Sequence, residues 1–259
     1  MNAPLLAVTG LHKRFGGLHA VDDVGFTVDP GRLQALIGPN GAGKTTVFNL
    51  ISGFLRPDAG RVTLAGQDIT DRRPDRVARL GLVRTFQIVR PFAQMTVLEN
   101  ILVGFHARTR GGLAAALLRP PAVRRQDAAV RDEAEEILRT IRLTDRAAEP
   151  AANLTFGQQR FLEIGRALAA RPRLLMADEP AAGLNPQETA FLGELLQAIR
   201  ARGITILLVE HDMTLVMRVA EHIVVLDFGK KIAEGPPAVV RGDPAVLAAY
   251  LGTDEETAA

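Results

Sequence analysis

The sequence predicts an α/β fold, with a parallel core sheet, an antiparallel β subdomain and an inserted α-helical subdomain. Three observations lead to this prediction: short apolar runs with helical stretches between them, β-rich segments near the N-terminus, and a central stretch with helical periodicity. A chain of 259 residues with 47% hydrophobic content can bury most of the surface that its unfolded form exposes. We therefore expect a single domain over residues 1–259, with the helical insert over about residues 88–165.

The N-terminal part predicts antiparallel strands. Leu5–Val8, Gly25–Val28 and Arg61–Ala65 alternate apolar and polar residues or are rich in β-branched residues, and Gly, Asp or Pro residues bound them. These segments form the expected β subdomain.

Five apolar runs predict the core strands. Each is short and bounded by turn-forming or charged residues, which is typical of strands buried on both faces of a parallel sheet. The runs are Leu33–Ile37, Leu82–Phe86, Leu174–Ala177, Ile204–Val209 and Ile223–Leu226.

The helical insert is predicted by apolar residues that recur every three or four positions between Thr96 and Arg146. They are Leu98, Ile101, Leu102, Phe105, Ala134, Ile137, Leu138 and Ile141. The connector Gly104–Gln126 contains arginines but no acidic residue, and an acidic stretch, Asp127–Glu136, follows it. Such charge runs are more often solvated helical faces than nucleic-acid patches.

A phosphate-binding loop follows the first apolar run, so the strand-loop-helix context that this motif needs is present. Its residues are Gly38, Pro39, Asn40, Gly41, Ala42, Gly43, Lys44, Thr45 and Thr46. A glycine-rich turn with a chance lysine would lack this context. The loop therefore predicts binding of a nucleoside triphosphate.

The residue types of the loop fit this chemistry. Gly38, Gly41 and Gly43 allow successive backbone N–H groups to approach one anion, and the N-terminus of the following helix favours negative charge. We expect Lys44 to reach the β- and γ-phosphates, Thr45 to coordinate Mg²⁺, and Thr46 to add a further donor. Gly53 is expected to end the helix.

Two carboxylates follow the strand Leu174–Ala177. Asp178 can hold Mg²⁺ through water, and Glu179 can polarise an attacking water molecule, since adjacent residues at a strand end point in different directions. Any strand that leaves the core can end on an acid, so the phosphate loop is what favours the functional interpretation.

Three further residues are candidates for the same site. Gln87 follows the strand Leu82–Phe86 and could touch both the metal and the attacking water, and His211 follows another strand and could contact the γ-phosphate. Phe15 could stack on an adenine. The alternatives are a solvated glutamine and a core phenylalanine. The remaining histidines, His12, His19, His106 and His222, are expected to be structural or on the surface.

Composition excludes several other classes of protein. Without cysteine the chain has no disulfide, no thiolate metal site and no redox dithiol. A formal net charge of +2 does not indicate non-specific binding to nucleic acid. We expect no signal peptide and no membrane-spanning segment, because no apolar stretch approaches about 18 residues.

The motifs resemble those of the ATP-binding-cassette (ABC) family, over essentially the whole chain and in the family's order. Along the chain these motifs are the phosphate loop, Gln87, Leu154–Gln158, Leu174–Glu179 and His211. The resemblance implies a phosphate-loop NTPase fold and two cassettes facing head to tail, with ATP between the phosphate loop of one and a partner loop of the other. That partner loop is Leu154, Thr155, Phe156, Gly157 and Gln158. The resemblance also implies that Phe15 stacks on adenine, Gln87 senses the membrane partner, Glu179 is the general base and His211 is the γ-phosphate switch.

Three positions depart from the family's commonest pattern. Thr155 replaces Ser and keeps the hydroxyl, whereas Phe156 replaces a Gly and removes a flexible position. Asn185 stands where the family usually has Asp.

The variant motifs resemble those of ATPases of branched-chain amino acid importers, which share much of the pattern with importers of urea and short amides. The segments involved are Phe15–Leu18, Phe156–Arg160, Ala181–Pro186, Gly229–Gly235 and Ala249–Gly252. This resemblance implies ATP and Mg²⁺ as cofactors, a second ATPase subunit that is this chain or a sister chain, two membrane permease subunits and, indirectly, a solute-binding protein. It implies a peripheral position on the cytoplasmic side of the inner membrane.

The alternative from a different class is a soluble ABC ATPase that acts on nucleic acid or ribosomes. Such proteins normally carry tandem cassettes, a long coiled-coil insertion or a strongly basic face, and the sequence shows none of these. No nucleic-acid partner is therefore expected.

Overall fold

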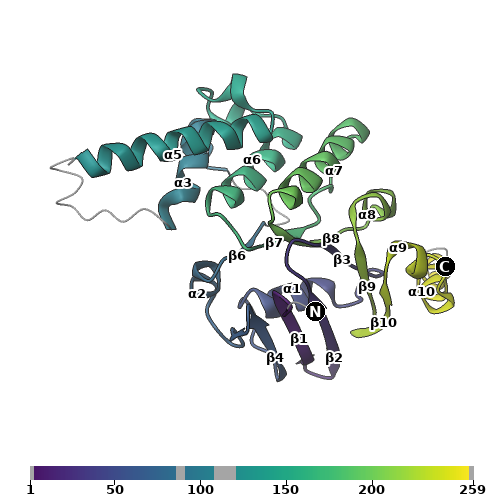
Figure 1. Cartoon of the computed structure of the whole chain (residues 1–259). Coiled ribbons are helices and arrows are strands. Elements are labelled where there is room, and N and C mark those ends of the chain that lie inside the picture. Colours follow the sequence, from purple (N-terminus) through teal and green to yellow (C-terminus); the bar gives the residue numbers. More distant parts are fainter. Residues whose placement is uncertain (1–2, 86–90, 108–120, 257–259) are drawn as a thin grey trace.

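The computed structural model describes residues 3–85, 91–107 and 121–256 (Figure 1). A four-stranded antiparallel sheet, in the order β2-β1-β4-β5, forms the N-terminal part. Its strands are β1 (Leu6–Phe15), β2 (Leu18–Val28), β4 (Ala59–Leu64) and β5 (Gln67–Asp68). The predicted antiparallel strands are confirmed, although β1 and β2 are longer than expected and form a hairpin that turns after Phe15.

A six-stranded sheet in the order β10-β9-β3-β8-β7-β6 forms the core. Its strands are β3 (Leu33–Ile37), β6 (Leu82–Arg84), β7 (Leu174–Asp178), β8 (Thr205–Val209), β9 (His222–Asp227) and β10 (Lys230–Gly235). Neighbours pair in parallel from β6 to β9, and only β10 is antiparallel. The five predicted core strands and the α/β fold class are confirmed. Strand β6 ends at Arg84, the predicted strand residue Phe86 lies outside the described residues, and β10 was not predicted.

Helices lie on both sides of this sheet. They are α1 (Lys44–Ile51), α2 (Pro74–Arg79), α3 (Val97–Gly104), α5 (Pro121–Thr140), α6 (Phe156–Ala169), α7 (Pro186–Ala201), α8 (Met213–Val219), α9 (Pro237–Val240) and α10 (Pro244–Glu256). Short 3₁₀ segments lie at Phe105–Ala107, Thr144–Arg146 and Ala151–Asn153. Among the residues that the structure describes, no helix is both long and apolar enough to cross a membrane.

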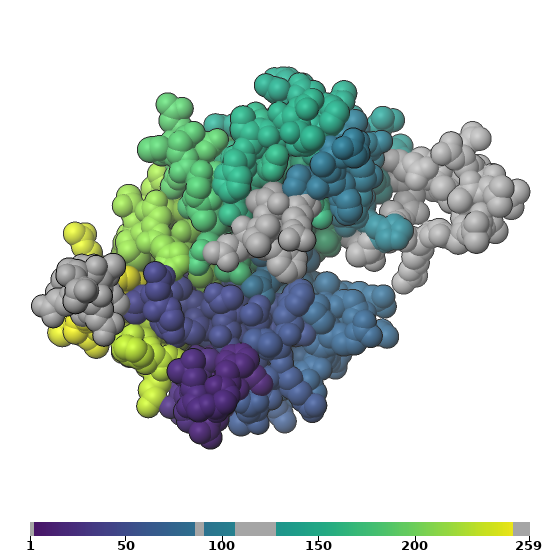
Figure 2. Space-filling model, turned by 180° about the vertical axis from the view of Figure 1, so that it is seen from behind, coloured from purple at the N-terminus to yellow at the C-terminus, as the bar shows by residue number. Residues whose placement is uncertain are grey.

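The helical region stands apart from the N-terminal sheet. Figure 1 shows α3, α5 and α6 together on the far side of the core from β1, β2 and β4, and Figure 2 shows the same layering from behind. Helices α3 and α5 and most of α6 fall within residues 88–165. The boundaries of a separate helical subdomain stay a prediction.

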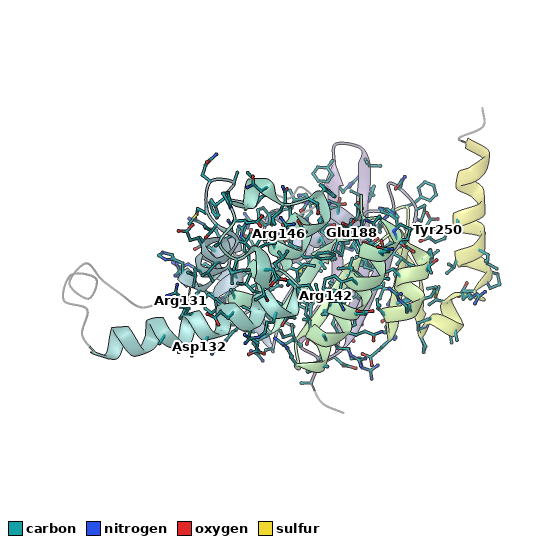
Figure 3. The ribbon with its side chains drawn as sticks, turned by 90° about the horizontal axis from the view of Figure 1, so that it is seen from above. Arg131, Asp132, Arg142, Arg146, Glu188 and Tyr250 are labelled. Carbon is teal, nitrogen blue, oxygen red and sulfur yellow. The ribbon has the colours of Figure 1, made fainter. Side chains whose placement is uncertain are left out.

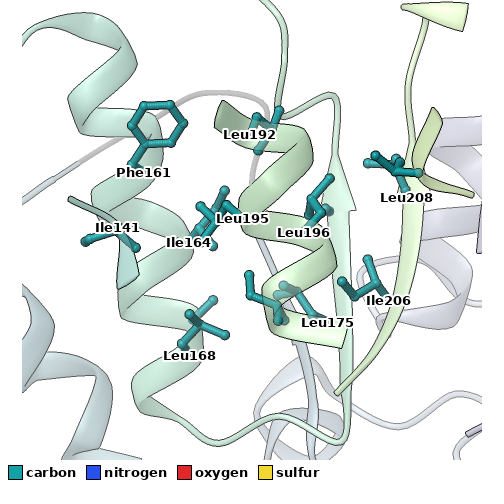
Figure 4. Packing of buried hydrophobic residues seen from close by; sticks show 14 of the residues in the cluster. Ile141, Phe161, Ile164, Leu168, Leu175, Leu192, Leu195, Leu196, Ile206 and Leu208 are labelled. Carbon is teal, nitrogen blue, oxygen red and sulfur yellow. The ribbon is translucent and has the colours of Figure 1, made fainter. Parts of the chain in front are cut away.

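Each core strand is buried on both faces, which explains why its sequence is a continuous apolar run. In β3, Leu33, Ala35 and Ile37 belong to the hydrophobic cluster under the helices, whereas Leu36 belongs to the cluster under the antiparallel sheet. Figure 4 shows the first cluster, in which Leu175 and neighbouring strand residues pack against side chains of α6 and α7. The sheet therefore holds the helical and antiparallel layers on opposite faces.

Replacing Leu196 tests the packing between α7 and the sheet. Leu196 has no exposed surface, so Leu196→Ala leaves a cavity and should lower the free energy of unfolding by about 2–5 kcal/mol. Leu247→Ala is the matched control, because half of that side chain is exposed. Urea denaturation of both variants measures the difference. Equal losses of stability in the two variants would contradict the assignment of Leu196 to the core.

Candidate functional site

The phosphate loop joins the end of β3 to the start of α1. Gly38, Gly41 and Gly43 have φ angles of 149°, 80° and 97°, which strain any residue with a Cβ atom. A Cβ atom on Gly38 would also overlap the carbonyl oxygen of Leu226, and one on Gly43 would overlap that of Ala20. The predicted need for glycine at these positions is therefore conformational and steric.

Lys44 is the first residue of α1, and only 5% of it is exposed. Its ammonium donates hydrogen bonds to the carbonyl oxygens of Gly38 (2.7 Å) and Pro39 (2.8 Å). Burial lowers the pKa of Lys44 below its ordinary value of 10.5, and the nearby carboxylates of Glu179 and Asp178 partly oppose this. The ammonium is therefore held inside the loop, near the carboxylates at the end of β7.

The carboxyl ends of β7 and β8 bring the candidate catalytic side chains together. Asp178 and Val209 are register partners on these parallel strands, and the N–H of Glu179 donates to the carbonyl of Val209 at 2.9 Å. Glu179 takes a left-handed conformation with φ 47°. Its Oε1 lies 2.6 Å from Nε2 of His211, just beyond β8. The structure thus pairs the predicted base with the predicted switch residue.

A pocket of about 550 Å³ lies over the phosphate loop. It combines Phe15 of the β1–β2 hairpin, loop and helix residues including Lys44, and the side chains of Glu179 and His211. Further lining residues are Asn40, Gly41, Ala42, Gly43, Thr45 and Thr46. Gln87 lies outside the described residues. Residues 154–158 do not line this pocket.

Several residues with no predicted role in the site also line the pocket, among them His19 and Phe228. His19, which was expected to be merely structural or on the surface, is exposed at the pocket. Phe228 stands in the tight β9–β10 turn with φ 42°, and 86% of it is exposed. The sequence could have indicated this residue, because a phenylalanine in the turn between Asp227 and Gly229 cannot reach the core and is therefore exposed.

Glu210 is a buried acid between Val209 and His211, and no motif in the sequence indicated a role for it. Its carboxylate accepts hydrogen bonds from the backbone N–H groups of Ala181 (2.6 Å), His211 (2.9 Å) and Asp212 (3.4 Å). Burial raises the pKa of Glu210, and these hydrogen bonds partly offset that effect. Glu210 therefore ties the loop after Glu179 to the loop that carries His211.

The C-terminal helix also contacts the phosphate loop. Tyr250 of α10 forms a hydrogen bond with the backbone of Gly38, and burial raises the pKa of its hydroxyl. Figure 3 shows Tyr250 next to the C-terminal helices. Tyr250, which belongs to the segment Ala249–Gly252 that carries part of the family resemblance, thus contacts the first glycine of the loop.

The segment 154–158 forms the start of α6. Thr155 caps this helix: its Oγ1 accepts from the N–H of Gln158 (3.3 Å), and the side chain of Gln158 accepts from the N–H of Thr155 (3.0 Å). Phe156 is the first helical residue and lies against Gly183, so this position needs no glycine. A Cβ atom on Gly157 would overlap the carboxylate of Glu188, which explains the glycine there.

Asn185 caps α7, a role that either Asn or Asp can fill. Its Oδ1 accepts from the N–H groups of Gln187 (3.0 Å) and Glu188 (2.9 Å), and Glu188 accepts in return from the N–H of Asn185 (3.0 Å). Figure 3 labels Glu188 in this position. An amide oxygen caps a helix as well as a carboxylate does.

The donor set of the site fits Mg²⁺. This ion prefers oxygen ligands, binds through one or two carboxylates together with substrate phosphates, and keeps several waters. The structure offers the exposed Thr45 next to the phosphate loop and the carboxylate of Asp178 at the neighbouring strand end. Asp178 is 4% exposed, so its orientation is fixed by its surroundings.

Comparison with known families decides the identity of the fold. Residues 21–182, which contain the phosphate loop, the partner loop, Asp178 and Glu179, match the family model described as ABC transporter. The chain belongs to the ABC transporter family. Residues 230–256 match a second model, described as branched-chain amino acid ATP-binding cassette transporter.

Individual ABC proteins are similar along the whole chain. The high-affinity branched-chain amino acid transport ATP-binding protein BraF of Pseudomonas aeruginosa is 47% identical, over 97% of this chain and 99% of its own length. LivG of Escherichia coli, with the same description, is 47% identical over the same shares. The ADP conformation of an ATP-binding cassette of an ABC transporter superposes with a TM-score of 0.84 at 35% identity, covering 97% of this chain and 100% of that one.

The capping role of Asn185 predicts the effect of two substitutions. Asn185→Ala should lower the free energy of unfolding by about 0.5–2 kcal/mol, because two N–H groups of α7 lose their acceptor. Asn185→Asp keeps an acceptor oxygen and should stay within about 0.5 kcal/mol of the native chain. Chemical denaturation checks both values. A loss in Asn185→Asp as large as in Asn185→Ala would show that capping is not what Asn185 provides.

Proposed function

We propose that this chain binds and hydrolyses ATP and thereby energises an importer of branched-chain amino acids. The observation that carries this proposal is the pocket that joins the phosphate loop to Glu179 and His211. The substrate class is supported by the full-length similarity to BraF and LivG and by the match over residues 230–256.

The phosphate loop supplies the binding energy for the triphosphate. Backbone N–H groups between Gly38 and Thr46 and the N-terminus of α1 favour the negative phosphates, and Lys44 provides the counter-charge. Phe15 lies at the mouth of the pocket, 47% exposed, and its ring suits stacking on adenine. Lys13 lies 5.7 Å from the centre of that ring.

Thr45 and Asp178 are the residues that would hold Mg²⁺, with Gln87 as a further predicted ligand. When bound, the ion neutralises charge on the β- and γ-phosphates. Thr45 contributes a hydroxyl oxygen from the start of α1, whereas Asp178 contributes a carboxylate from the end of β7. The two oxygen ligands thus come from two different elements.

Hydrolysis depends on Glu179 and His211. Glu179, which lines the pocket, accepts a proton from the attacking water as general base. His211 contacts the γ-phosphate and, at 2.6 Å from Glu179, is close enough to orient the base. Glu210 holds the two loops that carry these residues.

A second ATPase subunit completes the site in this proposal. Thr155 and Gly157 stand at the N-terminus of α6, which suits phosphate binding, yet they do not line the pocket of their own chain. A head-to-tail arrangement would place residues 154–158 of one subunit over the ATP of the other. The second subunit is either another copy of this chain or a sister chain.

The remaining proposed partners are two membrane permease subunits and, indirectly, a solute-binding protein. The permease would contact the helical region and the segment that contains Gln87, which lies outside the described residues, on the cytoplasmic side of the inner membrane. ATP binding and hydrolysis would then move the helical region between two states that differ in their γ-phosphate contacts.

The role of Glu179 predicts a turnover defect without a binding defect. Glu179→Gln should retain affinity for ATP but lower turnover by roughly 10²–10⁴-fold, the usual contribution of a positioned general base. Glu194→Gln is the matched control, since Glu194 is exposed on α7 and pairs with Arg142. Phosphate release and binding of a fluorescent ATP analogue measure the two properties. Native turnover in Glu179→Gln would exclude Glu179 as the base.

The substrate class is tested by uptake of labelled leucine and labelled urea in cells whose only copy of the gene encodes Lys44→Ala. We expect leucine uptake to fall, because loss of a charge-assisted contact weakens triphosphate binding by about 1.5–3 kcal/mol. Lys231→Ala, a partly exposed lysine paired with Glu234, should support native uptake. A selective loss of urea uptake would point to urea or short amides, and unchanged uptake of both solutes would contradict the transport proposal.

A further inference from the structure

Arg84, the last residue of β6, forms hydrogen bonds with both β7 and the end of α1 through one guanidinium group. Its Nη2 donates to Oδ2 of Asp178 at 2.7 Å. Its Nη1 donates to Oδ1 of Asn49 at 2.7 Å and to Oγ of Ser52 at 3.0 Å, both at the C-terminal end of α1. The same α1 begins with Lys44 and Thr45, so Arg84 links the candidate metal carboxylate to the helix of the phosphate loop.

The ion pair between Arg84 and Asp178 is buried. The two side chains are 8% and 6% exposed, and the guanidinium carbon lies 5.6 Å from the ring centre of Phe48 and 5.7 Å from that of Phe54. Desolvation of both charges offsets most of their attraction, so a buried ion pair is weak evidence for a contribution to stability. It does fix geometry, because the planar guanidinium bonds in defined directions.

We infer that Arg84 is a positioning residue for Mg²⁺ binding, an inference that rests on the proposed function. Arg84 donates to Oδ2 of Asp178 and holds the carboxylate at a fixed angle, so Oδ1 would be the oxygen that takes the metal. Its contacts with Asn49 and Ser52 keep Asp178 in register with Thr45 at the other end of α1. Residues that orient a metal ligand in this way commonly change metal affinity by about 10–100-fold when removed.

The test measures affinity of the purified chain for a fluorescent, non-hydrolysable ATP analogue, first in EDTA and then as Mg²⁺ is added. Arg84→Met should bind the analogue in EDTA within about twofold of the native chain. The Mg²⁺ concentration that produces half of the full change in analogue affinity should be about 10–100-fold higher for this variant than for the native chain. Arg142→Met is the control, because Arg142 also pairs with an acid, Glu194, and lies over an aromatic ring, 4.1 Å from the centre of Phe191, but lies in the helical region (Figure 3).

Arg84→Lys provides a second test that keeps the positive charge. An ammonium cannot reproduce the planar fork to three acceptors, so the half-maximal Mg²⁺ concentration should still rise, by less than in Arg84→Met. This variant decides the question if Arg84→Met does not fold. An unchanged half-maximal concentration, or a lower one as expected if Arg84 competed with the ion, would overturn the inference.

The design separates this inference from the proposed function. If nucleotide affinity of the native chain does not respond to Mg²⁺, the proposed function itself is contradicted. If the native chain responds and the Arg84 variants respond identically, only the role of Arg84 is contradicted. A lower melting temperature with an unchanged Mg²⁺ response would mark Arg84 as purely structural.

Discussion

The parallel pairing of β3, β8 and β7 is the constraint on which the rest of the site depends. Leu36 and Asp178 are both register partners of Val209, so the phosphate loop, Glu179 and His211 all emerge at the same edge of the sheet. Parallel strands require crossover connections, which here are helices that cover both faces. A shift of one residue in this register would turn every alternating side chain to the opposite face and separate the functional groups.

Several charged groups are buried near this edge, and each is compensated by specific partners. Lys44 donates to loop carbonyls, Glu210 accepts backbone N–H groups, and Arg84 pairs with Asp178. Desolvation makes each of these groups costly unless its hydrogen bonds are formed. The arrangement contributes little net stability but restricts the site to one geometry, which suits a site that must hold a metal and a water in line.

Much of the fold was predictable from sequence because buried parallel strands leave an unmistakable pattern. The apolar runs reflect burial of the strands on both faces. The glycines of the phosphate loop reflect a second local requirement, because at Gly38 and Gly43 any residue with a Cβ atom would overlap a backbone carbonyl. Asp178 and Glu179 could be predicted because they end such a run. The partner loop 154–158 could be assigned only by resemblance, since nothing in its residue types identifies a phosphate contact in another subunit.

The parts that could not be predicted depend on strand order and on turn geometry. Arg84 and Asp178 are 94 residues apart, and they meet only because β6 lies beside β7. Glu210 follows a strand as Asp178 does, but its role as a link between two loops needs the positions of both loops. The contact of Tyr250 with Gly38 likewise requires the path of α10.

The most direct test of this account is a crystal structure of Glu179→Gln protein with ATP and Mg²⁺. We expect the phosphates in the loop from Gly38 to Thr46, adenine on Phe15, and residue 179 and His211 facing the γ-phosphate. If two copies assemble, Thr155 of the second should contact the same nucleotide. ATP bound away from this loop, or residue 179 directed away from the γ-phosphate, would contradict the central claim that three strand ends form one hydrolytic site.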